Sequence, residues 1–140
     1  MSPIATLQAE TAVAVHVLGI DPELRVLLDQ EAAVADPGTG WSLPAAMLRT
    51  GQDPSRLAQQ LVRQAGALPR RMDVVAVESE YRLGVHRLDL VFECRAERMW
   101  RQAVTGGPLW WSLNEIAGLT LTPRTRKAII GRWTSIWPNT

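Results

Sequence analysis

The chain has little of three things: cysteine, net charge and long apolar segments. Because Cys94 is the single cysteine, no disulfide bond can form within the chain, which fits a reducing cytoplasm. The formal net charge of +1 gives no overall reason to expect binding to nucleic acid or to an anionic membrane. No segment approaches the roughly 18 consecutive apolar residues of a membrane-spanning helix, and the opening stretch MSPIATLQAE lacks the basic and apolar regions of a signal peptide. We therefore expect a cytoplasmic protein with no nucleic-acid or membrane partner.

The composition is that of an ordinary folded domain. The chain has 140 residues, of which 46% are hydrophobic and 21% charged. That length and balance suit one domain around one core. There is no internal repeat and no low-complexity linker. We expect residues 1–140 to form a single domain, with its core over about 11–133.

Two predicted strands and a well-marked helix make up the first half. Thr11–Ile20 is β-branched and apolar, and after a turn signal Leu24–Gln30 is expected to form the second strand of a hairpin; the WSLP stretch is expected to be a further short strand. The helix that follows has clear ends. Asp53 is a good N-cap, Pro54 stands where its missing N–H is not needed, and Gly66 is a natural C-terminal stop.

The second half predicts a hairpin and a final helix. Met72–Arg82 and Val85–Arg95 flank a Leu-Gly turn, which is typical of antiparallel strands. In the second of these strands, His86 falls on the apolar face and Asp89 on the opposite face, so the two are not expected to pair. A capping box at Ser112 and a helix from Thr122-Pro123 through Trp137 follow. Strands and helices that interleave with hairpins indicate an α/β or α+β fold.

The order of these segments resembles the Nudix hydrolase superfamily. The likeness covers roughly Thr11–Trp133 and rests on the opening hairpin, GWSLPAA, the helix ending at Gly66, ESEYRLGVHRLDLVFEC and GPLWWSLNEI before a C-terminal helix. The resemblance implies a sandwich in which a mixed sheet lies between helices. It also implies Mg²⁺-dependent hydrolysis of a nucleoside diphosphate linked to another group.

The chain departs from the family's motif where the metal ligands are expected. That motif has Trp-x-Leu-Pro-Gly-Gly, then Gly-Glu, then a helix with Arg-Glu and Glu-Glu before a glycine. Trp41, Leu43 and Pro44 match, but Ala45-Ala46 replaces the glycine pair and Gln52 replaces the glutamate after Gly51.

Inside the helix the alignment has two possible registers, and neither restores a glutamate. Counted back from Gly66, the two motif pairs fall on Gln59-Gln60 and Arg63-Gln64; counted forward from Gln52, they fall on Gln60-Leu61 and Gln64-Ala65. Mg²⁺ prefers carboxylates, water and phosphate oxygens. The segment Arg49–Arg71 carries five arginines and one aspartate, a local formal charge of about +4. We therefore expect no metal at this helix and no cofactor.

Three functions remain open. The first is a metal-independent enzyme that isomerises, cyclises or eliminates a small organic molecule by acid–base chemistry, as in specialised metabolism. The second is a non-catalytic ligand-binding or regulatory module, and the third is a residual diphosphate hydrolase that uses acids outside the motif. The candidate catalytic residues are His86, Glu78 and Glu80, and the candidate ligand-binding residues are Arg63, Asp89 and Trp111.

Several of these residues also have an ordinary structural explanation. His86 and His16 both belong to apolar strand faces, where a core histidine bonded to the backbone is common. Glu78 and Glu80 share a face and could be paired carboxylates, although alternation on a solvated edge explains them equally well. Arg63 could meet a phosphate or carboxylate in place of a metal, or simply face solvent.

Tryptophan is concentrated at the end of the chain. Of the six tryptophans, Trp110 and Trp111 precede the capped helix, where one is expected in the core and the other to face a pocket, a partner or solvent. Trp133 and Trp137 are spaced to stack along one helix face. Packing within the domain or a homodimer contact would account for that pair.

Overall fold

The computed structural model describes residues 10–30, 35–36, 38–98 and 109–138. The elements in chain order are β1 (Glu10–Ile20), β2 (Val26–Leu28), β3 (Ala45–Met47), α2 (Pro54–Gln64), β4 (Ala67–Arg82), β5 (Val85–Arg98), β6 (Leu109–Trp111), α3 (Leu113–Ile116), α4 (Pro123–Gly131) and α5 (Trp133–Ile136). No helix in these ranges is long and apolar enough to cross a membrane.

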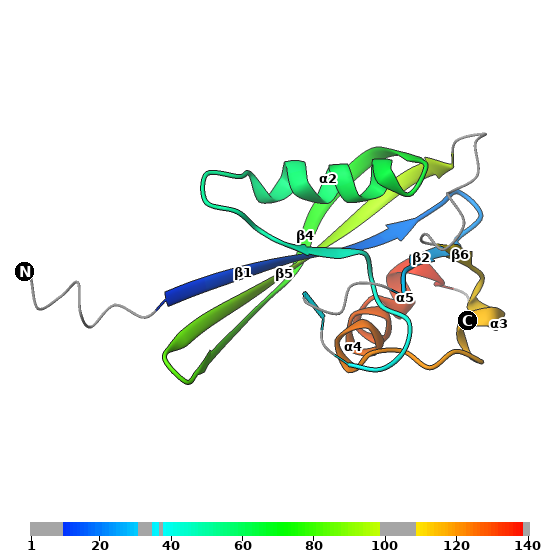
Figure 1. Cartoon of the computed structure of the whole chain (residues 1–140). Coiled ribbons are helices and arrows are strands. Elements are labelled where there is room, and N and C mark those ends of the chain that lie inside the picture. The colour runs from blue at the N-terminus through cyan, green and yellow to red at the C-terminus, as the bar shows by residue number, and fades with distance from the viewer. Residues whose placement is uncertain (1–9, 31–34, 37, 99–108, 139–140) are drawn as a thin grey trace, which may run out of the picture.

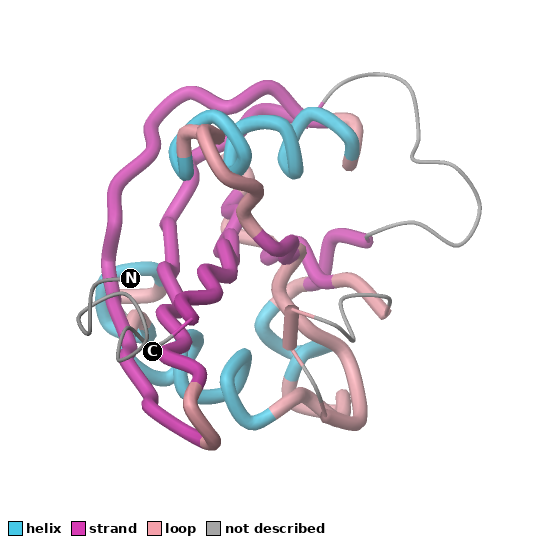
Figure 2. The backbone as a smooth tube through the Cα atoms, turned by 60° about the vertical axis from the view of Figure 1, so that its left-hand side comes forward, coloured by secondary structure: helices cyan, strands magenta, loops and turns pink. Residues whose placement is uncertain are grey.

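The strands form one mixed sheet between two helical layers (Figure 1). Its order is β4-β5-β1-β2-β6, with β3 also paired to β1. β1 runs parallel to β5 and antiparallel to β2 and β3. Helix α2 covers one face, whereas α4 and α5 lie on the other (Figure 2). The expected sandwich of a mixed sheet between helices is confirmed.

Alternation along β1 divides the core into two clusters. Val15 and Val17 pack with the apolar side of α2, whereas Leu18 and Ile20 pack with α4 and α5 on the opposite face. His16 belongs to this second face, because successive strand residues point to opposite sides. A polar side chain is therefore placed among residues that are completely buried.

The predicted ends of α2 are confirmed. The Asp53 side chain accepts a hydrogen bond from Ser55 N at 2.9 Å, and Pro54 is the first helical residue. Leu57, Ala58 and Val62 form the buried side. Burial of this side against the sheet accounts for the helix without any metal-binding role.

Asp53→Ala is expected to lower the free energy of unfolding by about 0.5–2 kcal/mol, because it removes the acceptor for an otherwise unpaired helix N–H. Urea unfolding followed by circular dichroism measures the change. Asp53→Asn is the matched control, since asparagine caps helices nearly as well. A loss of equal size in both variants would contradict the capping role.

Several predicted elements differ from the structure: β4 and β5 are longer than expected, and three others are displaced, shortened or interrupted. The strand expected at WSLP lies directly after it, at β3, and Trp41 and Ser42 form only isolated bridges. The second strand is restricted to β2. The final helix is interrupted at Arg132, which leaves α4 and α5 as separate segments. Gly131 immediately precedes the break, and glycine is poorly suited to a helix interior because it loses the most backbone freedom.

Candidate functional site

A histidine–aspartate pair lies buried between the sheet and α4. His16 Nε2 is 2.8 Å from Asp89 Oδ1, and the two residues are 0% and 2% exposed. The parallel pairing of β1 and β5 sets Asp89 opposite Ala14 and His16 opposite Val91, so the pair is a diagonal contact on one face. The carboxylate can only accept, so neutral His16 donates from Nε2. Its Nδ1 is buried without a hydrogen-bond partner among the described residues.

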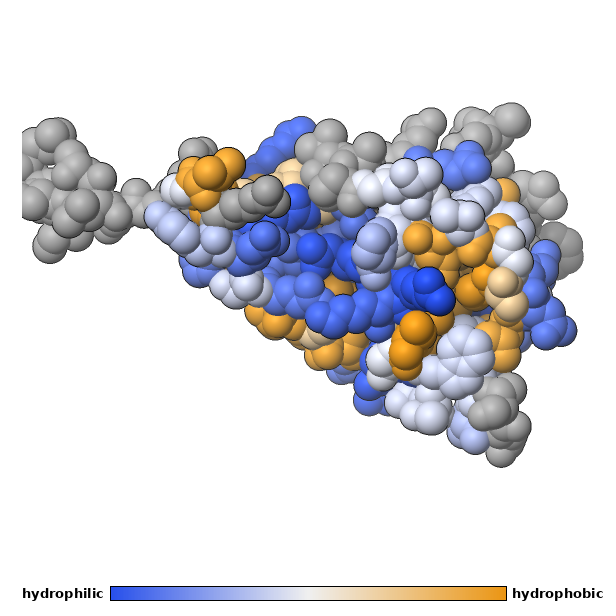
Figure 3. Space-filling model, turned by 90° about the horizontal axis from the view of Figure 1, so that it is seen from below, coloured by the Kyte–Doolittle hydropathy of each residue, from blue (hydrophilic) through white to orange (hydrophobic). Residues whose placement is uncertain are grey.

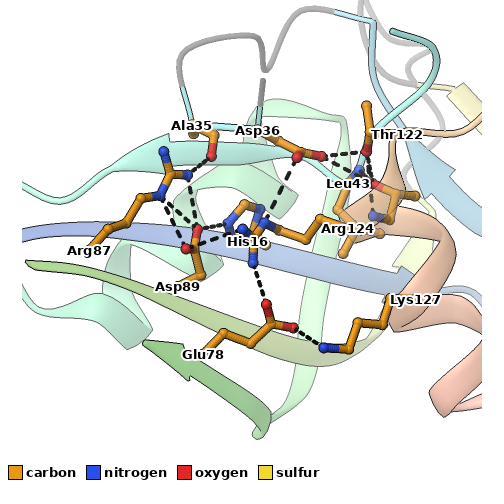
Figure 4. A network of polar contacts seen from close by, with 11 residues as sticks. His16, Ala35, Asp36, Leu43, Glu78, Arg87, Asp89, Thr122, Arg124 and Lys127 are labelled. Carbon is orange, nitrogen blue, oxygen red and sulfur yellow. Dashed lines mark hydrogen bonds and ion pairs between the residues drawn. The ribbon is translucent and has the colours of Figure 1, made fainter. Parts of the chain in front are cut away.

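Two arginines hold the Asp89 carboxylate from either side (Figure 4). Arg87, two residues earlier on the same face of β5, donates to it from Nη2 at 2.9 Å and from Nε at 3.1 Å. Arg87 also donates to the carbonyl oxygen of Ala35. Arg124 of α4 lies on the other side, with its Nη2 3.4 Å from Asp89 Oδ2. Asp89 therefore accepts hydrogen bonds from His16 and Arg87 and forms an ion pair with Arg124.

Arg124 joins carboxylates from three separate segments. Besides Asp89, its guanidinium is 2.8 Å from Glu78 Oε2 on β4 and 3.8 Å from Asp36 Oδ1 in the loop after β2. An arginine in the first turn of a helix is opposed by the helix dipole. The three acids offset this, and they explain why the side chain turns back over the sheet.

Threonine side chains fix the Asp36 end of this network. Thr122 Oγ1 donates to Asp36 Oδ2 at 2.5 Å, and Thr125 Oγ1 lies 3.4 Å from the same atom. Thr125 Oγ1 also accepts a hydrogen bond from Leu43 N at 2.9 Å. The start of α4, the Asp36 loop and the segment before β3 are therefore tied together by polar contacts.

A hollow of about 170 Å³ lies against this network, lined by Asp36, Glu80, Arg87, Pro123 and Arg124. Figure 3, which looks onto the α4 side of the molecule, shows hydrophilic residues gathered in a band beside apolar ones. The hollow and the network together hold four carboxylates and three cations, a formal charge of −1: Asp36, Glu78, Glu80 and Asp89 against Arg87, Arg124 and Lys127.

The network keeps His16 neutral and Asp89 ionised. Burial lowers the pKa of His16 below 6.5, although the hydrogen bond and charge of Asp89 act in the opposite direction. Burial by itself would raise the pKa of Asp89, but hydrogen bonds from Arg87 and His16 and the charges of Arg124 and Arg87 outweigh it and lower that pKa below 3.8. Outside this network, burial raises the pKa of the Cys94 thiol to about 11, which fits an inert thiol.

Stability is expected to fall as the pH drops below about 6.5, and His16→Gln is expected to flatten that dependence. The unfolded chain binds a proton on His16 near pH 6.5, whereas the folded chain resists it to lower pH, so protonation favours unfolding. Urea unfolding between pH 5 and 8 measures the slope. The same substitution at His86 is the control, because it shows how much replacing a histidine elsewhere changes the slope of the unfolding free energy against pH. An unchanged slope in His16→Gln would contradict this assignment.

No protein-family model matches the chain, and no curated protein is significantly similar in sequence. Solved structures are similar in fold. A Nudix hydrolase from Nitrosomonas europaea has a TM-score of 0.65 at 19% identity, over 90% of each chain. A MutT Nudix hydrolase from Burkholderia pseudomallei has a TM-score of 0.64 at 18% identity, over 86% of this chain and 97% of that one. The Nudix domain of Shewanella oneidensis NrtR, in complex with ADP ribose, has a TM-score of 0.64 at 11% identity, over 97% and 94%. The chain has the Nudix fold.

Within this Nudix fold, the segment that resembles the family's motif is the loop before α2 and α2 itself. Gln52, at the position of a motif glutamate, accepts a hydrogen bond from Arg49 N at 3.0 Å and so closes the turn before the helix. Arg63 and Gln64 are exposed. Among the described residues, no group of three or more His, Cys, Asp or Glu side chains is arranged to hold a metal.

The structure brings some of the predicted site residues together and separates others. Glu78 and Asp89 meet at Arg124, and Glu80 lines the adjoining hollow. His86 lies apart from them on the α2 side of the sheet, where its Nε2 is 2.5 Å from Ser79 Oγ.

The other two predicted ligand-binding residues, Arg63 and Trp111, lie outside the polar network around Asp89 and Arg124. Arg63 is on the exposed side of α2. Trp111 packs edge to face on Trp41 with ring centroids 4.9 Å apart, and its Nε1 is buried without a partner among the described residues. Trp133 and Trp137 contact each other at 5.1 Å, as their spacing predicts.

Sequence reasoning missed four central residues: His16 as the partner of Asp89, and Arg87, Arg124 and Asp36 as parts of the network. His16 carried a usable signal, because it is a titratable residue inside an otherwise apolar strand, and Arg87 stands two residues before Asp89 on the same strand. Arg124 and Asp36 become site residues only through contacts between distant segments.

Proposed function

We propose that this Nudix-fold chain acts on a small organic molecule by acid–base chemistry at the hollow beside Arg124, without a metal held by α2. The observation that supports it is the buried His16–Asp89 pair under Arg87 and Arg124. Taking charged groups out of water is unfavourable unless they are paired, and a well-packed apolar core of the same size is often as stable. Titratable groups with shifted pKa values beside a hollow are typical of functional sites.

The charges favour a neutral or cationic ligand over a phosphate. The hollow and the network under it have a formal charge of −1, and each described arginine in them already contacts a carboxylate. Glu80 is exposed and has no ion pair among the described contacts, so it is free to accept from an amine or hydroxyl. A nucleoside diphosphate would bring its anionic groups next to Glu80 and Asp36, which opposes binding. The hydrolase hypothesis therefore has the least support here.

His16 is the proposed proton-transfer group, with Asp89 fixing its orientation. A neutral imidazole that donates from Nε2 has its basic nitrogen at Nδ1, and that atom has no described partner. Because His16 has no exposed surface, a substrate can reach it only if Arg124 or the Asp36 loop moves. Glu80, which borders the hollow, is a second candidate acid. His86, on the opposite face, would need a separate site.

The complete burial of His16 also favours a second candidate function, namely ligand binding without chemistry. In that case the network is a rigid floor for the hollow and His16 is a structural histidine. The Nudix domain of Shewanella oneidensis NrtR, which has a similar fold, forms a complex with the small ligand ADP ribose. That complex supports small-molecule binding for this chain without deciding the reaction.

A thermal-shift screen of small organic amines, neutral polar heterocycles, ADP-ribose and nucleoside diphosphates tests the proposal. Amines or neutral compounds are expected to stabilise the chain, and Glu80→Gln is expected to weaken that effect. Arg63→Met, on the exposed side of α2, is the control. Hits incubated with EDTA and followed by mass spectrometry separate catalysis from binding, because His16→Gln should abolish turnover but retain binding. Stabilisation by diphosphates alone, with hydrolysis that requires Mg²⁺, would overturn the proposal.

A further inference from the structure

Another hollow lies between α4 and the α3 segment. Its volume is about 440 Å³, within the roughly 300–1,000 Å³ that is typical of small-molecule sites. Its lining residues come from α3, the loop that follows, α4 and α5, and none of them lines the hollow beside Arg124. In Figure 3 apolar residues gather to the right of the hydrophilic band, the side on which α3 lies in Figure 1. This α3–α4 hollow is therefore separate from the proposed acid–base site.

Large apolar side chains make up most of the lining of the α3–α4 hollow: Ile116, Leu119, Leu121, Ile129, Ile130 and Trp133. Ile116 and Ile129 are 5% and 2% exposed and belong to the buried core, whereas Ile130 is 60% exposed. The ring of Trp133 is held against that of Trp137, with centroids 5.1 Å apart. The hollow therefore extends the apolar core to the surface, and an apolar group that covers it is favoured because it removes this surface from water.

Arg126 is the one charged residue among those that line the α3–α4 hollow. It is exposed, and its guanidinium has no hydrogen bond or ion pair among the described contacts. By contrast, Arg124, two residues earlier on α4, is 2.8 Å from Glu78. The first turn of α4 also contains no acidic residue, although the helix dipole favours an anion there. The hollow thus combines apolar walls with one cation that no described carboxylate balances.

We propose that the α3–α4 hollow binds a small organic acid with one carboxylate and an apolar, ring-shaped body. The carboxylate pairs with the Arg126 guanidinium, whose planar donor groups match two carboxylate oxygens. The apolar body lies against the Trp133 ring and the side chains of Leu119 and Ile130. None of the lining residues is a histidine, cysteine, lysine or acid, so this site binds its ligand without reacting with it.

The single charge and the apolar walls select this class over other anions. One arginine balances one negative charge, whereas a phosphate group would keep a further charge beside walls that cannot solvate it. A neutral apolar molecule would leave the guanidinium without a partner. An anionic membrane surface is recognised by clusters of several basic residues, and Arg126 is a single cation in this lining.

Phenylacetate and phenylacetamide are the matched probes, because they share a ring and a shape but differ in charge. Calorimetry measures their affinities, and two-dimensional ¹H–¹⁵N NMR locates the site. Phenylacetate is expected to bind and to shift the backbone signals of residues 116–121 and 126–133. Phenylacetamide should bind about tenfold or more weakly, because it loses the charge-assisted pair. Inorganic phosphate should also bind weakly, since it has no apolar body.

Substitutions on α4 test the role of Arg126. Arg126→Met should weaken phenylacetate binding about tenfold or more and leave the affinity for phenylacetamide unchanged. Ile130→Glu should also weaken phenylacetate binding, because a carboxylate four residues after Arg126 competes for the guanidinium. Both side chains are exposed, so folding is expected to survive, and circular dichroism checks it. Arg56→Met, which removes the same charge from α2, is the control and should have no effect.

Several results would overturn the acid-binding proposal. They are equal affinity for phenylacetate and its amide, an unchanged affinity in Arg126→Met, no binding at millimolar phenylacetate, and shifted signals confined to the surroundings of Arg124. None of these results depends on whether the hollow beside Arg124 binds a ligand, because the two hollows share no lining residue.

Discussion

Arg124→Met is expected to lower the free energy of unfolding by about 3 kcal/mol, because it leaves three carboxylates without the cation that joins them. Removing one partner of a buried ion pair typically costs roughly 3–5 kcal/mol, and the Arg124 side chain is 20% exposed, which favours the lower end. Asp36 and Asp89 are almost fully buried. Glu78 retains Lys127 at 3.3 Å, and Asp89 retains Arg87, so the loss is partial rather than complete.

The pH dependence of this loss identifies its cause. Arg124 contributes to the lowered pKa of Asp89. Without it that pKa rises, so the stability difference between the two proteins is full near neutral pH and narrows as the pH falls to the lowered pKa of Asp89, below 3.8. A difference caused by lost packing alone would not narrow in this way. Urea unfolding at several pH values provides the measurement.

Two further substitutions control for charge and for position. Arg124→Lys retains the charge but not the planar donor fork, so an intermediate loss is expected. Arg126→Met removes an arginine two residues later on the same helix, where the side chain is exposed and has no ion pair among the described contacts. Surface changes of that kind stay within about 0.5 kcal/mol. Equal effects at Arg124 and Arg126 would mean that the network has no special energetic role.

The sequence predicted the parts of this fold whose signals are local. The N-cap, first-turn proline and terminal glycine around α2 lie within one short segment, and their effects need no distant contact. The alternation of β5 likewise predicted that His86 and Asp89 point to opposite faces, which the core clusters confirm for that strand. Periodicity and caps are properties of a few neighbouring residues, so they can be recognised without the fold.

The site could not be predicted in the same way, because its contacts join distant segments. His16 and Asp89 are 73 positions apart, and Arg124 reaches Asp36, which is 88 positions away. Which strand pairs with β1, and in which register, is decided by the whole sheet. The prediction of chemistry at His86 depended on the apolar face of β5 on which His86 lies. β1 has a similar apolar face around His16, and only the structure shows that His16 is the histidine facing Asp89. The role of either histidine in catalysis stays a prediction.

Asp89→Asn is expected to lower the free energy of unfolding as much as Arg124→Met does. When the two substitutions are combined, their effects are expected not to add. Asparagine keeps the size of the side chain but loses the charge, and its amide group presents donors to arginines that are themselves donors. A loss of about 3 kcal/mol is expected for a residue 2% exposed that accepts hydrogen bonds from His16 and Arg87 and pairs with Arg124.

Because Asp89 and Arg124 compensate each other, the double variant should lose less stability than the sum of the single variants, by about 0.5–3 kcal/mol. The exposed pair Arg70–Glu97, at 2.7 Å, is the control cycle, since more than half of each side chain is exposed. Its coupling is expected to be undetectable, as for most surface ion pairs. Additive losses at Asp89 and Arg124 would mean that their 3.4 Å contact carries no energy. Asp89 would then be held by His16 and Arg87 alone, and Arg124 would be fixed only by Glu78 and Asp36.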